Sequence, residues 1–427
     1  MSEYAVKYPG GELDLPEVPS TVGEPGLNIA PFMKTTGHVT LDIGFMNTAA
    51  CSSAITYIDG DAGILRYRGY PIEQLAEQSS FLETAYLLID GNLPTEAGLA
   101  AFEGEIGKHL SIPEGLKALY NGFPRDAHPM PILSAAVSAL STYYQDELDP
   151  DDKAQVEIST FRLLGALPTL AAYAYKHSQG QQFVEPDPSL GYVANFLRMT
   201  FGTAGQEYAL NPAVVSAVDT LLLLHADHEQ NCSTSTVRMV GSADANIYAS
   251  VSAGINALFG PLHGGANQAV MEMLQEIKDA GGDVAEFVRK VKNREDGVKL
   301  MGFGHRVYKS YDPRAAIVKG HVDSVLEALG VHDPLLDIAR QLEETALADD
   351  FFVSRKLYPN VDFYTGILYK AMGFPTDMFT VLFALGRLPG WVAQWREMTE
   401  DSDTKIGRPR QVYIGSDKRD YAPVSAR

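Results

Sequence analysis

The sequence predicts a mainly α-helical fold with a small β element near the N-terminus. Three observations lead to this fold class. Apolar residues recur at helical spacing through most of the chain after about residue 70. The alternation of apolar and polar residues that is typical of strands is confined to residues 27–67. We find no internal repeat and no low-complexity tract, which leaves the helical periodicity as the main signal.

The N-terminal part of the chain should be extended before it forms strands. Residues 1–27 are rich in Pro, Gly and Glu and show little periodicity, so we expect an extended or poorly ordered arm. Val39–Ile43 alternates apolar and polar residues and is predicted to be a strand. Ile55–Ile58 and Ile64–Tyr67 flank the glycine-containing turn Asp59–Gly63, which predicts a β-hairpin.

Nearly all of the remaining chain is predicted to be helical. Pro71 suits the first position of a helix, and Gly91 suits the position just past a helix that ends near Asp90. The segment Asn246–Phe259 is apolar on all faces, so it should lie in the interior of the protein. The periodic segments are residues 95–109, 131–146, 153–177, 189–201, 212–229, 244–259, 266–280, 313–329, 334–348, 361–372 and 376–386.

Length, charge and cysteine content limit the class of protein. The 427 residues can bury a large core and suggest two or three domains. The formal net charge of −20 argues against binding to nucleic acid or to an anionic membrane. Cys51 and Cys232 do not form a disulfide framework or a metal-ligand spacing, which favours a reducing compartment. The start at Met1–Tyr4 lacks a secretory signal and apolar runs are short, so we expect a cytoplasmic protein without membrane spans.

Three segments carry residue types suited to chemistry on an anionic substrate. In Met301–Arg314 a histidine follows two glycines, and three further cations come within nine residues. Glycines let backbone N–H groups approach a ligand closely, and cations balance the charge of an anion. The alternative is a solvated basic loop that leads into a helix. Gly260–Asn267 and Tyr358–Phe363 make this alternative weaker, because they place another histidine and an aspartate in turns at helix starts.

Together with His225–Arg238, these segments resemble the citrate synthase family, in particular the bacterial branch with a long form of this histidine-containing segment. The resemblance runs from roughly Ile55 to Tyr413, with several motifs in the same order and at similar spacing. It implies two helical domains around a cleft. Residues 28–263 and 375–427 would form the large domain, and residues 264–374 the small domain. Periodicity alone does not mark this boundary.

The resemblance implies an acyltransferase that condenses acetyl-CoA with oxaloacetate and hydrolyses the product to citrate and CoA. This chemistry needs a carboxylate base and two hydrogen-bond donors. Asp362, His263 and His305 match the family positions for the base, the donor to the enol and the donor to the ketone. The apolar neighbours of Asp362 would raise its pKa, although an aspartate there could also cap a helix. The helix that follows His263 would keep its imidazole neutral, whereas the alternative is a buried structural histidine.

The resemblance also assigns residues that bind the two substrates. His228, Arg314, Arg387 and Arg408 match positions that contact oxaloacetate, and the guanidinium groups suit its carboxylates. For any single arginine the alternative is a surface ion pair. In the family the residue matched by Arg408 comes from the partner subunit, so we expect a homodimer or a larger homo-oligomer with shared sites. The positions assigned to CoA are Lys299, Leu300, Met301, Gly302, Phe303, Gly304, Arg306 and Lys309.

Other kinds of site fit the sequence less well. His225 and His228 are three residues apart, as in a metal pair, but no third ligand follows at a recognisable spacing, so we expect no metal and no other cofactor. Gly302–Gly304 lacks the third glycine of a dinucleotide fingerprint, and no Gly-x-Ser-x-Gly motif of a hydrolase is present. Two alternatives stay open. One is 2-methylcitrate synthase, which uses propionyl-CoA, and the other is an inactive regulatory protein that binds CoA or a dicarboxylate.

Overall fold

The computed structural model describes residues 4–427, which form two compact units. One unit contains the described residues up to Ser52 together with Gly407–Arg427, and the other is Ser53–Ile406. Residues 1–3 of the predicted arm lie outside the described residues. Every residue that the sequence assigns to the active site lies in Ser53–Ile406, except Arg408.

The first unit consists of short strands, two short helical segments and loops. β1 pairs with β2 in an antiparallel hairpin in which Ala5 lies opposite Asp14, and β3 pairs with β4. The predicted arm therefore contains four short strands over its described residues. The elements of this unit are β1 (Ala5–Tyr8), β2 (Gly11–Asp14), β3 (Glu17–Val18), β4 (Gly26–Leu27), α1 (Phe32–Thr36) and η6 (Val424–Ala426).

The predicted strand at Val39–Ile43 is wrong. These residues belong to no strand, and the side chain of Ile43 is 83% exposed. The carboxylate of Asp42 accepts hydrogen bonds from the backbone N–H groups of Met46 (3.0 Å) and Asn47 (2.9 Å). An aspartate that bonds to the backbone just after itself stabilises a turn, and this local bonding replaces pairing with a neighbouring strand.

The second unit begins with a small antiparallel sheet that confirms the predicted hairpin. β5 (Thr56–Asp59) pairs with β6 (Ile64–Tyr67), and β6 pairs with β7 (Tyr70–Pro71). The turn between β5 and β6 lies against the loop that carries His305. The backbone N–H of Lys309 donates to the Gly60 carbonyl at 2.7 Å. A Cβ at Gly60 would lie 2.2 Å from the Val307 carbonyl oxygen, so this contact requires glycine.

The rest of the second unit is helical, as the sequence predicts. Its 3-10 segments are η1 (Tyr120–Gly122), η2 (Ser141–Tyr143), η3 (Gln145–Glu147), η4 (Glu295–Gly297) and η5 (Thr376–Met378). Its α-helices are α2 (Ile72–Gln78), α3 (Phe81–Asp90), α4 (Glu96–Gly107), α5 (Glu114–Leu119), α6 (Pro129–Leu140), α7 (Lys153–Ser178), α8 (Tyr192–Phe201), α9 (Pro212–Leu224), α10 (Cys232–Gly241), α11 (Ile247–Leu258), α12 (Ala266–Asp279), α13 (Val284–Asn293), α14 (Pro313–Leu329), α15 (Pro334–Ala348), α16 (Asp350–Val353), α17 (Asp362–Ala371) and α18 (Phe379–Glu400).

Several helix boundaries differ from those that periodicity predicts. Pro71 precedes α2 and does not start it, because it is extended and pairs with Arg66 in the small sheet. Gly91 directly follows α3, as predicted, and Ser80 caps the start of α3 by accepting from the Glu83 N–H (3.2 Å). The helix expected at 212–229 ends at Leu224. The helix expected at 376–386 extends as α18 to Glu400, with Pro389 inside it.

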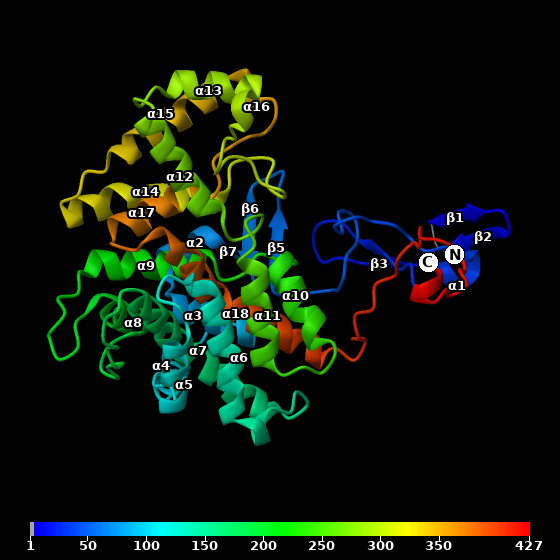
Figure 1. The fold of residues 1–427 in the computed structure, drawn as a ribbon, viewed down its shortest axis with the longest axis horizontal. Helices are drawn as coiled ribbons and strands as arrows, with labels where there is room; N and C mark the ends of the chain where they lie inside the picture. Colours follow the sequence, from blue (N-terminus) through cyan, green and yellow to red (C-terminus); the bar gives the residue numbers. More distant parts are fainter. Residues whose placement is uncertain (1–3) are drawn as a thin grey trace. The chain divides into compact units, whose positions relative to one another are not determined.

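The helix α18 forms the centre of this unit. It packs against α3, α7, α9, α10 and α11, and Figure 1 shows it in orange-red among these helices. Trp391 and Trp395 on α18 are at most 1% exposed. Helices α12–α17 lie together on one side (Figure 1), and the boundary of a small domain at residues 264–374 remains a prediction. Among the described residues, no helix combines the length and the apolar character needed to cross a bilayer.

Candidate active site

The predicted site residues of the second unit come from the ends of helices and from one buried helix. His228 lies in the turn between α9 and α10, and His263 lies in the turn before α12. His305 lies in the loop before α14, and Asp362 is the first residue of α17. Arg387 projects from α18. Residues far apart in sequence therefore meet where helices start or end, the places at which backbone N–H or C=O groups lack a partner within the helix.

His263 is held by the first turn of α10. The backbone N–H of Ser233 donates to its Nε2 at 3.3 Å, and the Ser233 hydroxyl lies 2.9 Å from the same nitrogen. Because a backbone amide can only donate, Nε2 is an acceptor and the proton of the neutral ring is on Nδ1. Burial, with a smaller contribution from Arg387, lowers the pKa of His263 to about 4. His263 is therefore a neutral hydrogen-bond donor through Nδ1–H.

His305 is fixed in the opposite tautomer. Its Nδ1 accepts from the backbone N–H groups of Val307 (3.0 Å) and Tyr308 (3.2 Å). The ring proton is therefore on Nε2. Burial and the nearby charge of Arg314 lower the pKa of His305 to about 4. Like His263, this ring is a neutral donor at pH 7.

His228 lies beside His305, with 5.2 Å between the ring centroids. Its Nε2 lies 3.3 Å from the Tyr308 hydroxyl, and burial with the charge of Arg314 holds its pKa well below the usual range. His225 and His228 do not share a helical face, because α9 ends before them and His225 Nδ1 bonds to the Leu221 carbonyl at 2.7 Å. Within residues 4–427, no three His, Cys, Asp or Glu side chains gather as metal ligands.

Asp362 combines an apolar setting with an unused oxygen atom. It lies between Val361 (4% exposed) and Phe363 (0% exposed), and its backbone N–H donates to the Asn360 side chain at 3.1 Å. Its Oδ1 is buried and has no hydrogen-bond partner among the described residues. Burial raises the pKa of Asp362 to about 6, although the positive charge of Arg314 opposes the rise. The predicted apolar environment is therefore present, and the carboxyl does not cap α17.

Arg314 is already paired with an acidic residue. Its Nη2 and Nε donate to the two carboxylate oxygens of Asp312 at 2.9 and 3.1 Å, and both side chains are buried. Burial alone would raise the pKa of Asp312, but Arg314 lowers it overall. The same carboxylate also accepts from the backbone N–H of Val361 (3.2 Å), one residue before Asp362. This pair therefore links the start of α14 to the start of α17.

Arg387 is a buried cation without a bonded carboxylate. Its Nε donates to the His225 carbonyl at 2.6 Å, but Nη1 is buried and has no partner among the described residues. Burial lowers the pKa of Arg387 to about 10, so the group is still charged at pH 7. A buried charge with an unused donor is costly unless an anion binds to it. Arg387 is therefore no part of a surface ion pair, and its role in binding an anion remains a prediction.

The residues that the resemblance assigns to CoA form a loop next to Asp362. Gly302 and Gly304 have φ values of +75° and +76°, and a Cβ at Gly302 would lie 2.7 Å from Val270. Leu300, Met301 and Phe303 pack on the hydrophobic core, while Lys299 and Arg306 are exposed. Lys309 Nζ donates to the Arg306 carbonyl at 3.0 Å. Arg408, the fourth predicted oxaloacetate residue, belongs to the other unit and is exposed.

Four residues near the site are not predicted from the sequence: Ser233, Tyr308, Asp312 and Phe383. The Phe383 ring lies 4.9 Å from the Arg387 guanidinium carbon and 6.2 Å from the His263 ring, so it packs between these two residues. Phe383 is one helical turn before Arg387, a spacing that could have indicated it. Asp312 directly precedes a proline, which is typical of a helix cap. Ser233 and Tyr308 have no such local signal.

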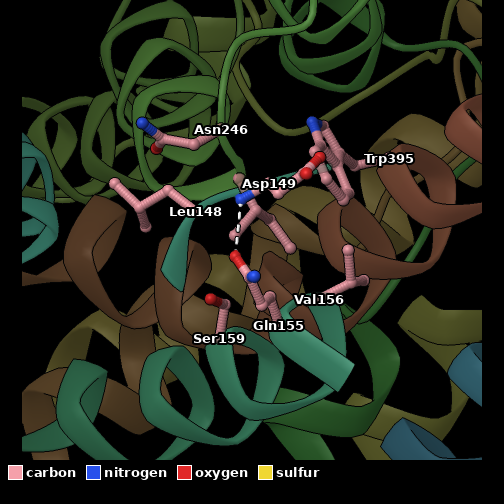
Figure 2. A pocket seen from close by; sticks show the side chains of 8 residues that line it. Leu148, Asp149, Gln155, Val156, Ser159, Asn246 and Trp395 are labelled. Carbon is pink, nitrogen blue, oxygen red and sulfur yellow. Dashed lines mark hydrogen bonds between the residues drawn. The ribbon is translucent and has the colours of Figure 1, made fainter. Parts of the chain in front are cut away.

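A small cavity elsewhere in the unit is separate from this cluster. Figure 2 shows it between Asp149, Ser159 and Trp395, with the Asp149 N–H bonded to the Gln155 side chain at 2.9 Å. Its volume of about 10 Å³ is close to the space that one water molecule needs. None of the predicted site residues lines it.

Comparison with known proteins identifies similar chains over the whole length. Residues 44–410 match the family described as citrate synthase, C-terminal domain. The chain is 65% identical over 422 residues to citrate synthase 1 of Mycobacterium tuberculosis, covering 99% of this chain and 98% of that one. It is 58% identical over 421 residues to the citrate synthase of Corynebacterium glutamicum, covering 98% and 96%.

Solved structures share the fold. The citrate synthase of Pyrobaculum aerophilum superposes with a TM-score of 0.81 at 35% identity, covering 100% of this chain and 98% of that one. The ternary complex of carboxymethyl coenzyme A and oxaloacetate with the citrate synthase of Thermoplasma acidophilum has a TM-score of 0.80 at 33% identity, covering 90% and 99%.

Proposed function

The chain belongs to the citrate synthase family, and we propose that it joins acetyl-CoA to oxaloacetate and hydrolyses the resulting citryl-CoA to citrate and CoA. One observation carries this proposal. The buried carboxyl of Asp362, whose pKa is raised, shares the charge of Arg314 with His305 and that of Arg387 with His263. Each of these neutral histidines has one ring nitrogen that accepts from a backbone amide, so the other nitrogen carries the proton and can donate it. Removal of a weakly acidic proton and polarisation of two carbonyl groups need this combination.

In the first step, Asp362 takes a proton from the methyl group of acetyl-CoA. A pKa of about 6 leaves the carboxylate ionised at pH 7–8 and more basic than an ordinary aspartate. Its Oδ1 has no partner among the described residues, so no hydrogen bond has to break before it accepts the proton. His263 donates its Nδ1–H to the thioester oxygen, on which negative charge develops as the C–H bond breaks.

In the second step, the enol carbon forms a bond to the ketone carbon of oxaloacetate. His305 donates Nε2–H to the ketone oxygen and polarises the carbonyl as the new bond forms. Arg387, His228 and Arg314 hold the two carboxylates, which fixes the ketone beside the enol. Water then adds to the thioester carbon of citryl-CoA and the thiol of CoA leaves. These steps use protein side chains and water, so we expect no metal or redox cofactor.

The subunit arrangement is part of the same proposal. Arg408 belongs to the unit that contains Gly407–Arg427, and the family resemblance assigns its position to the site of a partner subunit. We therefore propose a homodimer, or a larger homo-oligomer, in which each site receives Arg408 from its neighbour. The acidic net charge of −20 argues against nucleic acid as a partner and fits an enzyme of the cytoplasm.

The test is the release of thiol by the purified protein. CoA should appear only when both acetyl-CoA and oxaloacetate are present, and omission of oxaloacetate is the control. The catalytic efficiency should be higher for acetyl-CoA than for propionyl-CoA, although one methyl group is worth only about 1–3 kcal/mol in a pocket. A preference for propionyl-CoA would identify a 2-methylcitrate synthase. No release with either thioester would favour the regulatory protein.

A further inference from the structure

Asn360 is bonded both to the glycine loop and to the residue proposed as the base. It is 9% exposed and lies in the extended segment that leads into α17. Its side-chain Nδ2 donates to the Gly304 carbonyl at 2.9 Å. Its Oδ1 accepts from the backbone N–H of Asp362 at 3.1 Å. One amide group therefore connects the loop at Gly302–Gly304 with the first turn of the helix that carries the base.

The backbone supports this connection. The N–H of Asn360 donates to the Gly302 carbonyl at 2.9 Å, and the N–H of Gly304 donates to the Tyr358 carbonyl at 2.7 Å. Phe303 and Pro359 form an antiparallel bridge between these two bonds. The positive φ values of Gly302 and Gly304 let the loop follow the 358–360 segment closely. The loop and this segment form a short two-stranded ladder that ends next to Asp362.

The backbone at Asp362 is held by this ladder, through Asn360, and by the Asp312 carboxylate, which accepts from the Val361 N–H at 3.2 Å. The Oδ1 of Asp362 itself has no hydrogen bond among the described residues. Asn360 supplies the acceptor that a cap residue normally provides, since its Oδ1 bonds to the N–H two residues later. A shift of the loop would move Asn360 and would turn the first residues of α17 with it.

We propose that Asn360 is a positioning residue that couples the CoA loop to the base, so that occupation of the loop by the nucleotide end of acyl-CoA holds Asp362 in place for proton removal. This proposal rests on the proposed function, because it takes the loop at Lys299–Gly304 as a binding element for CoA. Misplacement of a reacting group by about 1 Å can lower a rate by about 100-fold, so a link of this kind can affect kcat strongly.

The test uses Asn360→Ser. Serine keeps an acceptor for the Asp362 N–H and is too short to reach the Gly304 carbonyl, so the cap is retained while the link is lost. We expect kcat to fall by at least about 10-fold, because the base is less well placed. The Kd of CoA, measured by calorimetry, should change by less than about 3-fold, since the loop itself is intact. In the wild type, CoA should slow amide hydrogen exchange in residues 358–366, and this slowing should disappear in the variant.

Asn211→Ser is the matched control. Asn211 caps α9 in the same way, accepting from the Ala213 N–H at 3.0 Å, and its Nδ2 reaches the Ala328 carbonyl at 3.5 Å. This variant keeps the cap and loses the bond to Ala328, just as Asn360→Ser keeps its cap and loses the bond to Gly304, but it does so away from the active site, so all three measurements should match the wild type.

Several results would overturn the proposal. These are a loss of kcat smaller than about 10-fold, a Kd of CoA that rises in step with the loss of kcat/KM, retained slowing of exchange, or an equal loss in Asn211→Ser. If Asn360→Ser does not fold, Asn360→Asp is measured in the same way, because it keeps the cap and the shape but lacks the donor to Gly304. A wild type that binds CoA but does not condense the substrates would instead contradict the proposed function.

Discussion

Replacement of Asp362 by Asn should inactivate the enzyme and at the same time stabilise the fold at alkaline pH. Burial raises the pKa of this carboxyl from 3.8 to about 6, a difference worth about 3 kcal/mol. The folded state binds the proton more tightly than the unfolded chain. The group therefore contributes stability that is fully present below pH 3.8 and is lost as the pH rises through about 6. Above pH 7 the ionised carboxylate costs the fold about 3 kcal/mol, and an amide avoids this cost because it cannot ionise.

Thermal unfolding at two pH values measures this effect. An unfolding entropy of about 2.1 cal/mol/K per residue means that 1 kcal/mol shifts the Tm of a chain of this length by about 1 °C. Asp362→Asn should therefore melt about 3 °C above the wild type at pH 8 and close to the wild type at about pH 4. Loss of a general base should lower the rate of condensation by about 100- to 10,000-fold.

Asp219→Asn is the control for the stability effect. Burial also raises the pKa of Asp219 to about 6, and its carboxylate accepts from the Phe81 N–H at 2.9 Å, a bond that an asparagine oxygen can keep. This variant should show a similar gain in Tm at pH 8 but retain activity, because Asp219 lies on α9 away from the proposed site. The reasoning is refuted if Asp362→Asn is no more stable than the wild type at pH 8, or if its gain is the same at both pH values.

Two further variants test other parts of the site. Ser233→Ala should lower kcat by about 10-fold, because His263 loses its contact with the hydroxyl at 2.9 Å. It should also lower the stability of the fold by about 1–3 kcal/mol, because the Trp391 indole N–H loses the acceptor that lies at 3.2 Å. Steady-state kinetics and melting curves measure both effects, and an unchanged kcat would contradict the role of this hydroxyl. Arg408→Ala should weaken oxaloacetate binding, and its mixture with Asp362→Asn should recover activity in heterodimers that contain one complete site. Exchange of subunits without recovery would show that the site is not shared.

The sequence predicts helices best where the start carries a strong local signal. The helices predicted at 313–329 and 334–348 match α14 and α15 to the residue. Each starts with an aspartate cap followed by proline at the first helical position, a combination that needs no tertiary contact. By contrast α10, which begins Cys-Ser-Thr-Ser-Thr, is not predicted, because these residues have low helix propensity and the helix is stabilised by packing on α11 and α18. The helix α13 is also absent from the predicted segments, although the sequence does carry a local signal for it, the Asp283 cap before an amphipathic segment.

The residue types of the site could be predicted from the sequence, but their chemical states could not. The tautomer of His263 depends on Ser233, which is 30 residues away in the sequence. Which guanidinium nitrogen of Arg387 is left without a partner depends on the bond from its Nε to the His225 carbonyl, 162 residues away. No local pattern encodes such contacts. His305 is different, because its tautomer is set by N–H groups two and three residues further along its own loop. That state could be predicted by modelling the loop alone.

Arg314 and Arg387 differ in how much positive charge each leaves for the dicarboxylate of the proposed reaction. Arg314 and Asp312 form a buried bidentate pair, so the net charge of this pair is close to zero. Arg387 has a carboxyl group nearby in Asp227, but burial raises the pKa of Asp227, which weakens its ability to balance the cation. Both histidines beside the arginines are neutral at pH 7 and add no positive charge. The positive charge that an incoming carboxylate meets in this cluster therefore comes mainly from Arg387, in a buried place where little water screens it.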